Sequence, residues 1–396
     1  PNEDALSRAR FTAPAIIEDA RIGRHLATYG GWVTEGAYRA RASSGGLGSW
    51  LQAELLDKGL VDAVLDVTAV EVDEAGKPLF RFTVVDSVDG VRANAKTRYY
   101  PVELSGVISY MRDNPGRYAM IGVPCFAKAM HLVARVDPVV AERLHFVLAI
   151  VCGHLKSAAF AEAIAWQLGI APDRLTDIDF RTKIEGRPAS RYGATVTGRD
   201  AAGQSVTEVR PMEGLLGANW GHGLFKLKAC EFCDDVLGET ADATVGDAWL
   251  PRYDDDHRGS NVLVVRDPTL LRLVEAGVAE GRLHLDPLSA DDVAASQAGG
   301  LRHRRDGLSY RLWMTDREGA WRPTKRVKAR RDHLDPLMQR VHRLRYGLGQ
   351  KSHAIFAAAR ASGRLQDFLS DMEGPIATYE RQMKPSLLHR LVNRLH

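Results

Sequence analysis

Four cysteines are the residues of this chain with the clearest potential for chemistry. Cys230 and Cys233 form a C-x-x-C pair inside "KACEFCDDVLGETADATVGDAW", whereas Cys125 and Cys152 stand alone. So few cysteines in 396 residues exclude a disulfide scaffold, and a C-x-x-C in a cytoplasmic protein indicates metal or redox chemistry. Four converging thiolates can hold a zinc ion or an iron–sulfur cluster.

The spacing of these cysteines bears on which group they hold. Structural zinc sites usually use two close pairs, and this sequence has one. A cuboidal cluster accepts dispersed ligands because its four irons face four directions, although the compact ferredoxin spacing is absent here. An alternative is that Cys230 and Cys233 form a redox pair or a small zinc knuckle, with Cys125 and Cys152 buried only for packing.

Two strand–loop–helix segments position the isolated cysteines. The segments "YAMIGVPCFAKAMHLVARV" (118–136) and "LHFVLAIVCGHLKSAAFAEAIAWQLGI" (144–170) each contain a buried strand, a cysteine and then a helix. Such units predict parallel strands joined by crossover helices. Because the carboxyl ends of parallel strands lie at one edge, Cys125 and Cys152 are expected to be neighbours there.

A Ser/Gly turn marks a second candidate site. The stretch "RASSGGLGSW" (41–50) leads into a helical pattern over 47–60, and a helix that begins this way leaves backbone N–H groups free to bind an anion. The alternative is a plain helix cap on the surface.

The remaining patterns set the fold class. Strands are expected at 61–73, 78–87, 241–250 and 261–267, and basic helical sequence fills about 320–396. We predict an α/β fold with a mixed, largely parallel sheet, crossover helices and a helical C-terminal appendage. The predicted regions are 1–115, with the Ser/Gly turn, 116–300, with the cysteines, and a basic extension, 301–396.

Composition narrows the class of protein. Hydrophobic residues make up 45% of the chain, charged residues 26%, and the net charge is +3, which is ordinary for a globular protein and gives no bias toward nucleic acid. No apolar run is long enough to span a membrane and no secretory leader is evident, so a cytoplasmic location is expected. The chain begins with Pro1 instead of Met, which is consistent with further sequence upstream.

Five motifs in order carry a resemblance to a known family. They are "ASSGGLGSWLQAELLDKGLVDAVL", "GVPCFAKAMHLV", "VCGHLKS", "DFRTKIEGR" and "CEFCDDVLGETADATVGDAW". Over about residues 24–295 the sequence resembles the beta subunits of coenzyme F-420 hydrogenase and dehydrogenase, a family that also includes reductases of chlorophyll derivatives. The resemblance implies FAD and a 4Fe–4S cluster in one polypeptide.

The resemblance also implies roles for individual residues. It assigns the cluster to Cys125, Cys152, Cys230 and Cys233, and the flavin turn to Ser43, Ser44, Gly45 and Gly46. It assigns cofactor contacts to Arg181, Lys183, Gly246 and Asp247.

This sequence departs from the family in two places. Where the family often has Gly-Ser-Lys-Tyr, this sequence has "KTRYY" (96–100), so Arg98 stands in place of the lysine, close to Tyr100. The arginine side chain presents several hydrogen-bond donors in a fixed plane, whereas lysine presents a single compact charge. A ferredoxin-like module with its own cysteine runs is absent, which implies that a separate ferredoxin or electron-carrier subunit supplies electrons, or that the module lies upstream.

Two histidines are candidate catalytic residues. His154, just after Cys152, is predicted to donate a hydrogen bond to the cluster or to relay protons near the flavin, and a helix-capping role is the alternative. His222, in "NWGHG" (219–223), is predicted to line the active site, with an incidental place in a tight turn as the alternative.

Together these features predict a flavin and iron–sulfur oxidoreductase. It would couple a one-electron carrier such as ferredoxin to a two-electron organic substrate, for which the deazaflavin coenzyme is one candidate. The alternatives are a ferredoxin-dependent reductase of a tetrapyrrole, a non-catalytic relay subunit and a zinc-bound scaffold. Homo-oligomers are compatible with the sequence.

The basic C-terminal segments carry a separate prediction. Arg302, Arg304, Arg305 and the stripe from Lys325 to Arg345 are predicted to dock an acidic ferredoxin. A solvated helix face is the alternative.

Overall fold

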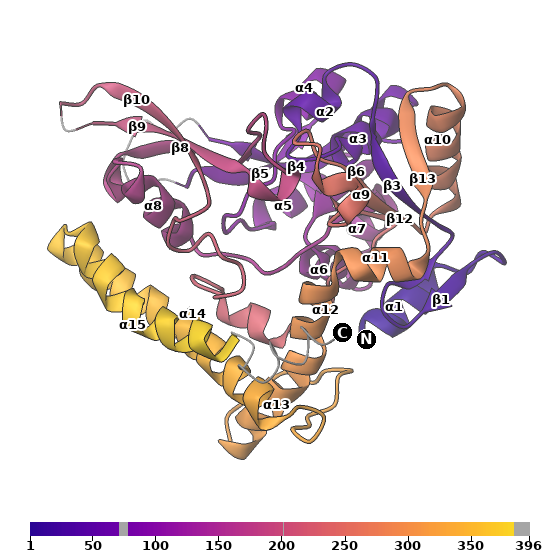
Figure 1. The fold of residues 1–396 in the computed structure, drawn as a ribbon. Helices are drawn as coiled ribbons and strands as arrows, with labels where there is room; N and C mark the ends of the chain where they lie inside the picture. The colour runs from indigo at the N-terminus through magenta and orange to yellow at the C-terminus, as the bar shows by residue number, and fades with distance from the viewer. Residues whose placement is uncertain (71–77, 201, 384–396) are drawn as a thin grey trace.

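One large mixed sheet organises the molecule (Figure 1). The computed structural model describes residues 1–70, 78–200 and 202–383. The strand order of the sheet is β13-β3-β12-β11-β7-β6-β4-β5. Its strands are β3 (Ala27–Val33), β4 (Ala63–Ala69), β5 (Phe80–Val85), β6 (Tyr118–Gly122), β7 (Leu144–Ile150), β11 (Ala243–Asp247), β12 (Asn261–Val265) and β13 (Leu283–Pro287).

The centre of this sheet is parallel and its flanks are antiparallel. Strands β4, β6, β7 and β11 pair in parallel, whereas β5 on one side and β12, β3 and β13 on the other pair antiparallel. Every residue of β6 is buried, as expected for a central strand covered on both faces. The predicted mixed α/β fold is therefore confirmed, and its antiparallel share is larger than the sequence suggested.

Helices cover both faces of the sheet, and the alternation of side chains decides which face each one packs on. On one face, Val64 and Leu148 pack with Trp50 of α3 and Leu270 of α10. On the other, neighbouring strand residues pack with α5, α6 and α7. The helices that precede residue 290 are α1 (Glu3–Arg10), α2 (Tyr38–Arg41), α3 (Leu47–Asp57), α4 (Val88–Ala93), α5 (Ser105–Asp113), α6 (Pro124–Ala134), α7 (Pro138–Arg143), α8 (Ala158–Gln167), α9 (Pro251–Asp254) and α10 (Pro268–Ala279).

Two smaller sheets complete the strand inventory of the described residues. Strands β8 (Leu175–Thr182), β9 (Gly193–Arg199) and β10 (Ser205–Pro211) form an antiparallel sheet, and β1 (Ile17–Asp19) pairs with β2 (Gly23–His25). Short 3₁₀ turns occur at Pro172–Arg174, Ala189–Arg191 and Lys228–Phe232.

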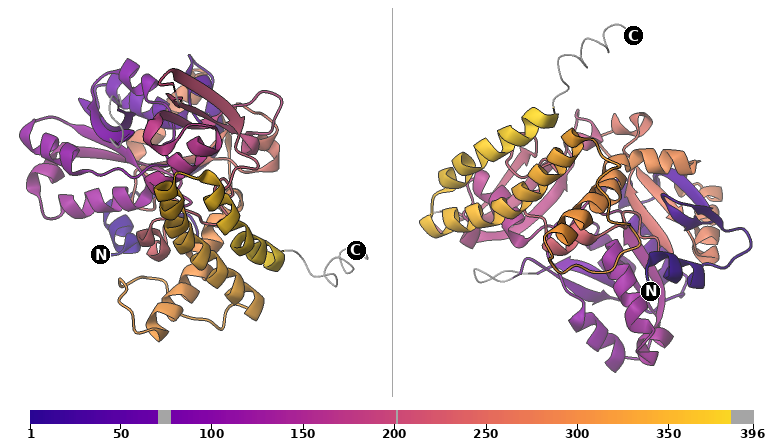
Figure 2. Two further views of the ribbon diagram at one scale, coloured as in Figure 1. Left: turned by 90° about the vertical axis from the view of Figure 1, so that its left-hand side faces the viewer. Right: turned by 90° about the horizontal axis from the view of Figure 1, so that it is seen from below.

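The C-terminal helices are part of a hydrophobic core. They are α11 (Ala290–Ser296), α12 (Ala298–Arg304), α13 (Asp306–Arg317), α14 (Pro336–Ser362) and α15 (Leu365–Met383). Phe356 of α14 and Phe368 of α15 pack with Phe160, Phe180 and Phe225 in one buried cluster. The hairpin of α14 and α15 crosses below the small sheet and α8 (Figures 1 and 2), so the predicted helical C-terminal region is present and is more closely packed than an appendage.

Two predictions reach beyond the described residues. The strand expected over 61–73 is seen to Ala69, and residues 71–77 lie outside the described part, as do 384–396 of the expected helical tail. The three-region division stays a prediction. Across residues 1–70, 78–200 and 202–383, none of the helices combines the length and the apolar character that crossing a membrane requires.

Candidate functional site

A cavity of about 1060 Å³ lies where the central strands end. Its walls include Gly122 at the end of β6, Val151 just after β7 and Gly246 in β11, together with residues of the C-terminal helices. Ligands collect at the carboxyl ends of parallel strands, and this volume is at the upper end of the usual range for small-molecule sites. Of the residues predicted from the sequence, Ser43, Ser44, Gly46, Arg98, Tyr100, Cys152, His154, Arg181, Gly246 and Asp247 line it.

Gly46 is the N-cap residue of helix α3, and its backbone is left-handed, with φ +92°. A Cβ atom at Gly46 would lie 2.9 Å from the carbonyl carbon of Tyr38, so packing of the chain itself requires glycine there. The next amide, of Leu47, donates to Asn261 Oδ1 at 3.1 Å. The turn is therefore partly satisfied by protein, and the anion site that it offers is smaller than the sequence indicated.

Hydrogen bonds tie the Ser/Gly turn to three other segments. Ser43 Oγ accepts from the Thr97 amide at 3.0 Å, and Ser44 Oγ donates to the Ser260 carbonyl at 2.8 Å. Lys183 Nζ donates to the carbonyls of Ser44 (3.0 Å) and Arg39. Burial, followed by the charge of Lys96, lowers the pKa of Lys183 to about 7. Lys183 does not line the cavity, so it supports the turn from behind instead of touching a ligand.

Arg181 and Asp247 form a closed ion pair on the cavity wall. The guanidinium donates to both Asp247 oxygens at 2.8 and 2.9 Å and to Tyr99 Oη at 3.2 Å. It also stacks on the ring of Tyr192, 4.1 Å from the ring centre. Such a bidentate pair has fixed geometry, so these residues shape the wall before any ligand arrives.

Arg98 has no such partner. Its guanidinium lies 5.0 Å from the ring centre of Phe80, its Nε is buried without a hydrogen bond, and within the described residues no carboxylate lies at ion-pair distance. Asp66, on β4, also faces the cavity, and burial raises its pKa to about 7. Asp66 was missed from the sequence, although an acid inside the apolar strand "AVLDV" is a usable signal.

The fold brings the four cysteine thiols into one neighbourhood. Cys125 is the second residue of α6, and Cys152 follows β7. Cys230 lies in a 3₁₀ turn and Cys233 just after it. Burial, followed by the nearby thiols of Cys233 and Cys230, raises the pKa of the Cys125 thiol to about 12. The Leu155 amide donates to Cys230 Sγ at 3.3 Å, an N–H···S bond of the kind that tunes iron–sulfur centres.

The four thiols are the candidate ligands of a metal group. In the part of the chain that the structure describes, no three His, Cys, Asp or Glu side chains are grouped as ligands of one metal ion. A cubane is larger than a single ion and is held from four sides. Four thiols without a histidine or carboxylate among them fit the cubane, and the ligand set stays a prediction.

The two predicted histidines lie in different environments. His154 is buried on the cavity wall, its ring centre 4.6 Å from that of Trp220, and Nε2 has no partner. Burial, then the charges of Lys156 and Lys226, lower its pKa well below the usual value, so His154 is neutral. His222 does not line the cavity; its Nε2 lies 3.1 Å from Glu380 of α15. His222 therefore holds a helix in place.

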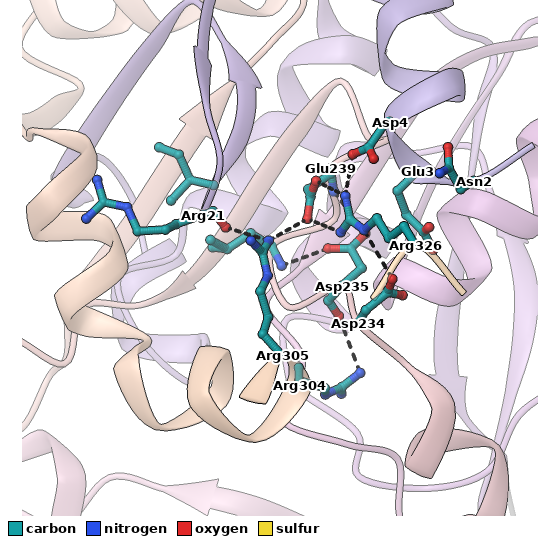
Figure 3. A network of polar contacts seen from close by, with 12 residues as sticks. Asn2, Glu3, Asp4, Arg21, Asp234, Asp235, Glu239, Arg304, Arg305 and Arg326 are labelled. Carbon is teal, nitrogen blue, oxygen red and sulfur yellow. Dashed lines mark hydrogen bonds and ion pairs between the residues drawn. The ribbon is translucent and has the colours of Figure 1, made fainter. Parts of the chain in front are cut away.

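Several of the basic residues predicted to dock a carrier are engaged inside the protein, whereas Arg302, Lys328, Arg331, Arg340 and Arg343 are exposed, so docking stays a prediction. Arg304 is 1% exposed, and Arg305 pairs with Glu239. Lys325 pairs with Asp234, and Arg326 pairs with both acids (Figure 3). Both acids lie in "CDDVLGE", which begins at the second cysteine of the C-x-x-C, so their basic partners come from a segment far along the chain.

Comparison with known proteins identifies the family. The model of the N-terminal domain of the coenzyme F420 hydrogenase/dehydrogenase beta subunit matches residues 28–109, and the model of the C-terminal domain matches residues 116–291. The chain belongs to this family. No curated protein matches the chain.

A solved structure supports the fold. A chain of the F420-reducing [NiFe] hydrogenase complex from Methanosarcina barkeri is similar at 17% identity and a TM-score of 0.52, covering 73% of this chain and 92% of that one. Residues beyond 291, including α12 to α15, lie outside both family models.

Proposed function

We propose that this chain is an oxidoreductase that uses FAD and a 4Fe–4S cluster to couple a one-electron carrier such as ferredoxin to a two-electron organic substrate of the deazaflavin type. The observation that carries the proposal is the shared cavity: the Ser/Gly turn and Arg98 line one part, and the Cys152–His154 loop lines another. When bound, the two groups together would exchange single electrons for electron pairs.

Each part of the chain has a role in this proposal. Cys125, Cys152, Cys230 and Cys233 would hold the cluster. Among the described residues, no carboxylate pairs with the guanidinium of Arg98. This guanidinium and the turn at 43–46 suit the phosphates or the electron-rich edge of a flavin, because arginine presents several donors in a plane. Neutral His154 beside Trp220 offers a hydrogen bond without adding charge.

The cluster and flavin are tested on protein purified without oxygen. We expect about four irons per chain, the content of one cubane, and one flavin released on denaturation. Cys152→Ser should lose iron, whereas Arg98→Ala should lose flavin and keep iron. Bound zinc in place of iron would contradict the proposal.

Catalysis is tested with an artificial electron donor and a deazaflavin acceptor. Turnover by the isolated chain is the expected result. Full cofactor content without turnover would instead indicate a relay subunit that works only within a larger complex.

A further inference from the structure

Arg304, at the end of α12, reaches two of the cysteine segments from inside the protein. Its Nη2 donates to the Cys152 carbonyl at 3.0 Å and to Cys152 Sγ at 3.7 Å. Nη2 and Nε donate to the Gly153 carbonyl at 2.7 and 3.1 Å, and Nη1 donates to the Asp235 carbonyl at 3.3 Å. One guanidinium therefore joins the turn after β7 to the segment after Cys233.

The charge of Arg304 has no carboxylate partner at ion-pair distance among the described residues. Its neighbour Arg305 pairs with Glu239 at 3.1 Å, and Arg326 pairs with the same acid at 2.6 Å (Figure 3). A buried charge is costly unless an anion compensates it. The acceptors of Arg304 are neutral carbonyls and a thiol, so the missing anion is expected at the cysteines.

We propose that Arg304 is a positioning residue for the iron–sulfur cluster, which orders its ligand segments and raises its reduction potential. This inference rests on the proposed function. Reduction adds one negative charge to the cluster, and a positive charge fixed beside a ligand sulfur stabilises that reduced form. Arginine keeps its charge even when buried, so the effect does not vary with pH.

The proposed effect on the cluster depends on a residue of the C-terminal segment. The family models end at residue 291, and Arg304 follows on α12. The cluster cysteines therefore come from the shared family domains, while the charge that tunes them comes from sequence outside those domains.

The test compares Arg304→Gln and Arg304→Lys with the matched controls Arg305→Gln and Arg305→Lys, all as full chains with cofactors. Each is held at the solution potential at which the wild-type cluster is half reduced, and the reduced fraction is read by electron paramagnetic resonance. We expect at least a tenfold lower ratio of reduced to oxidised cluster in Arg304→Gln, a shift of about 59 mV for one electron. Arg304→Lys and both controls should stay within threefold of wild type.

Iron content separates the remaining outcomes. An Arg304→Gln protein that keeps its iron and matches Arg305→Gln in reduced fraction overturns the inference. If Arg304→Gln loses iron while Arg305→Gln keeps it, the positioning role is supported. Arg304→Lys then tests the role of the charge. A tenfold lower ratio of reduced to oxidised cluster in Arg304→Lys would overturn the proposed effect of the charge on the reduction potential. Wild-type protein without iron would refute the proposed function itself, whereas a wild-type cluster that is indifferent to Arg304 refutes only this inference.

Discussion

The cavity has one wall within the family domains and another formed by the C-terminal helices, and the two walls compensate their charges differently. On the first wall, Arg181 is neutralised by Asp247 through two hydrogen bonds. On the second wall, Arg345 donates to the Trp220 carbonyl. Behind the cavity lining, one buried acid, Glu231, pairs with both Lys226 and Arg311. Within the described residues, the first wall pairs Arg181 and leaves Arg98 without a carboxylate at ion-pair distance, whereas Arg345 of the second wall has a backbone carbonyl as its partner.

The largest expected effect tests whether the second wall is needed for folding. Removing residues 336–396 should abolish the folded state, because buried Phe356 and Phe368 are each worth roughly 1.5–3 kcal/mol and several more core residues go with them. That sum approaches the ~5–15 kcal/mol stability of a typical protein. Circular dichroism and thermal unfolding would check this. A soluble truncated protein with a cooperative transition would show that the family domains stand alone.

Asp247→Ala should destabilise the first wall by about 3 kcal/mol, because it leaves the charge of buried Arg181 unpaired. Denaturant unfolding measures the change. The control Asp255→Ala alters an exposed acid just after α9. Its free energy of unfolding should stay within ~0.5 kcal/mol of the wild-type value. Equal effects of the two substitutions would argue against a preformed wall.

Arg98→Ala should weaken flavin binding by roughly 10- to 100-fold, the value of a hydrogen bond to a charged group, about 1.5–3 kcal/mol. Stability should change little, because no carboxylate of the described residues lies at ion-pair distance from Arg98 and would lose its partner. Fluorescence titration of the apoprotein with FAD gives the affinity, and Arg92→Ala, on an exposed helix, is the control. An unchanged affinity would place the flavin elsewhere in the cavity.

The smallest effect concerns Asp66 and pH. Its pKa of about 7 in the folded protein lies above the ordinary value of 3.8, so the folded state holds the proton more tightly than the unfolded state. Stability from this group is present below pH 4 and is lost as pH rises through 7. Asp66→Asn should therefore flatten the fall in unfolding free energy between about pH 4 and 7. An identical slope in both proteins would mean that Asp66 is ionised throughout.

Local sequence patterns predicted the strands and helices that position the site. The strands at β4, β6, β7, β11 and β12 and the helices α3, α6 and α8 fall within the predicted ranges, because buried β-branched runs and helical spacing are encoded over a few residues. The antiparallel sheet of β8, β9 and β10 was not foreseen, since pairing depends on partners that a local pattern does not reveal.

The charged residues were harder to foresee than the elements. Arg304, Arg305 and Arg326 look alike in a basic sequence, and only the fold separates the one beside Cys152 from those paired with Glu239. The same holds for His222, whose partner Glu380 is 158 residues away. Motifs indicate which residues can do chemistry, and long-range contacts decide which of them are free to do it.

The bond network at Arg326 has a consequence for biosynthesis. Arg326 joins Asp4 of α1 to Asp234 and Glu239, the acids that follow the C-x-x-C. The ribosome synthesises α1 and the cysteines long before residue 326. The contacts of Arg326 with α1 and with the acids after the C-x-x-C therefore form late in synthesis. Under the proposed function, iron would be inserted late in maturation, after the C-terminal segment has packed against the start of the chain.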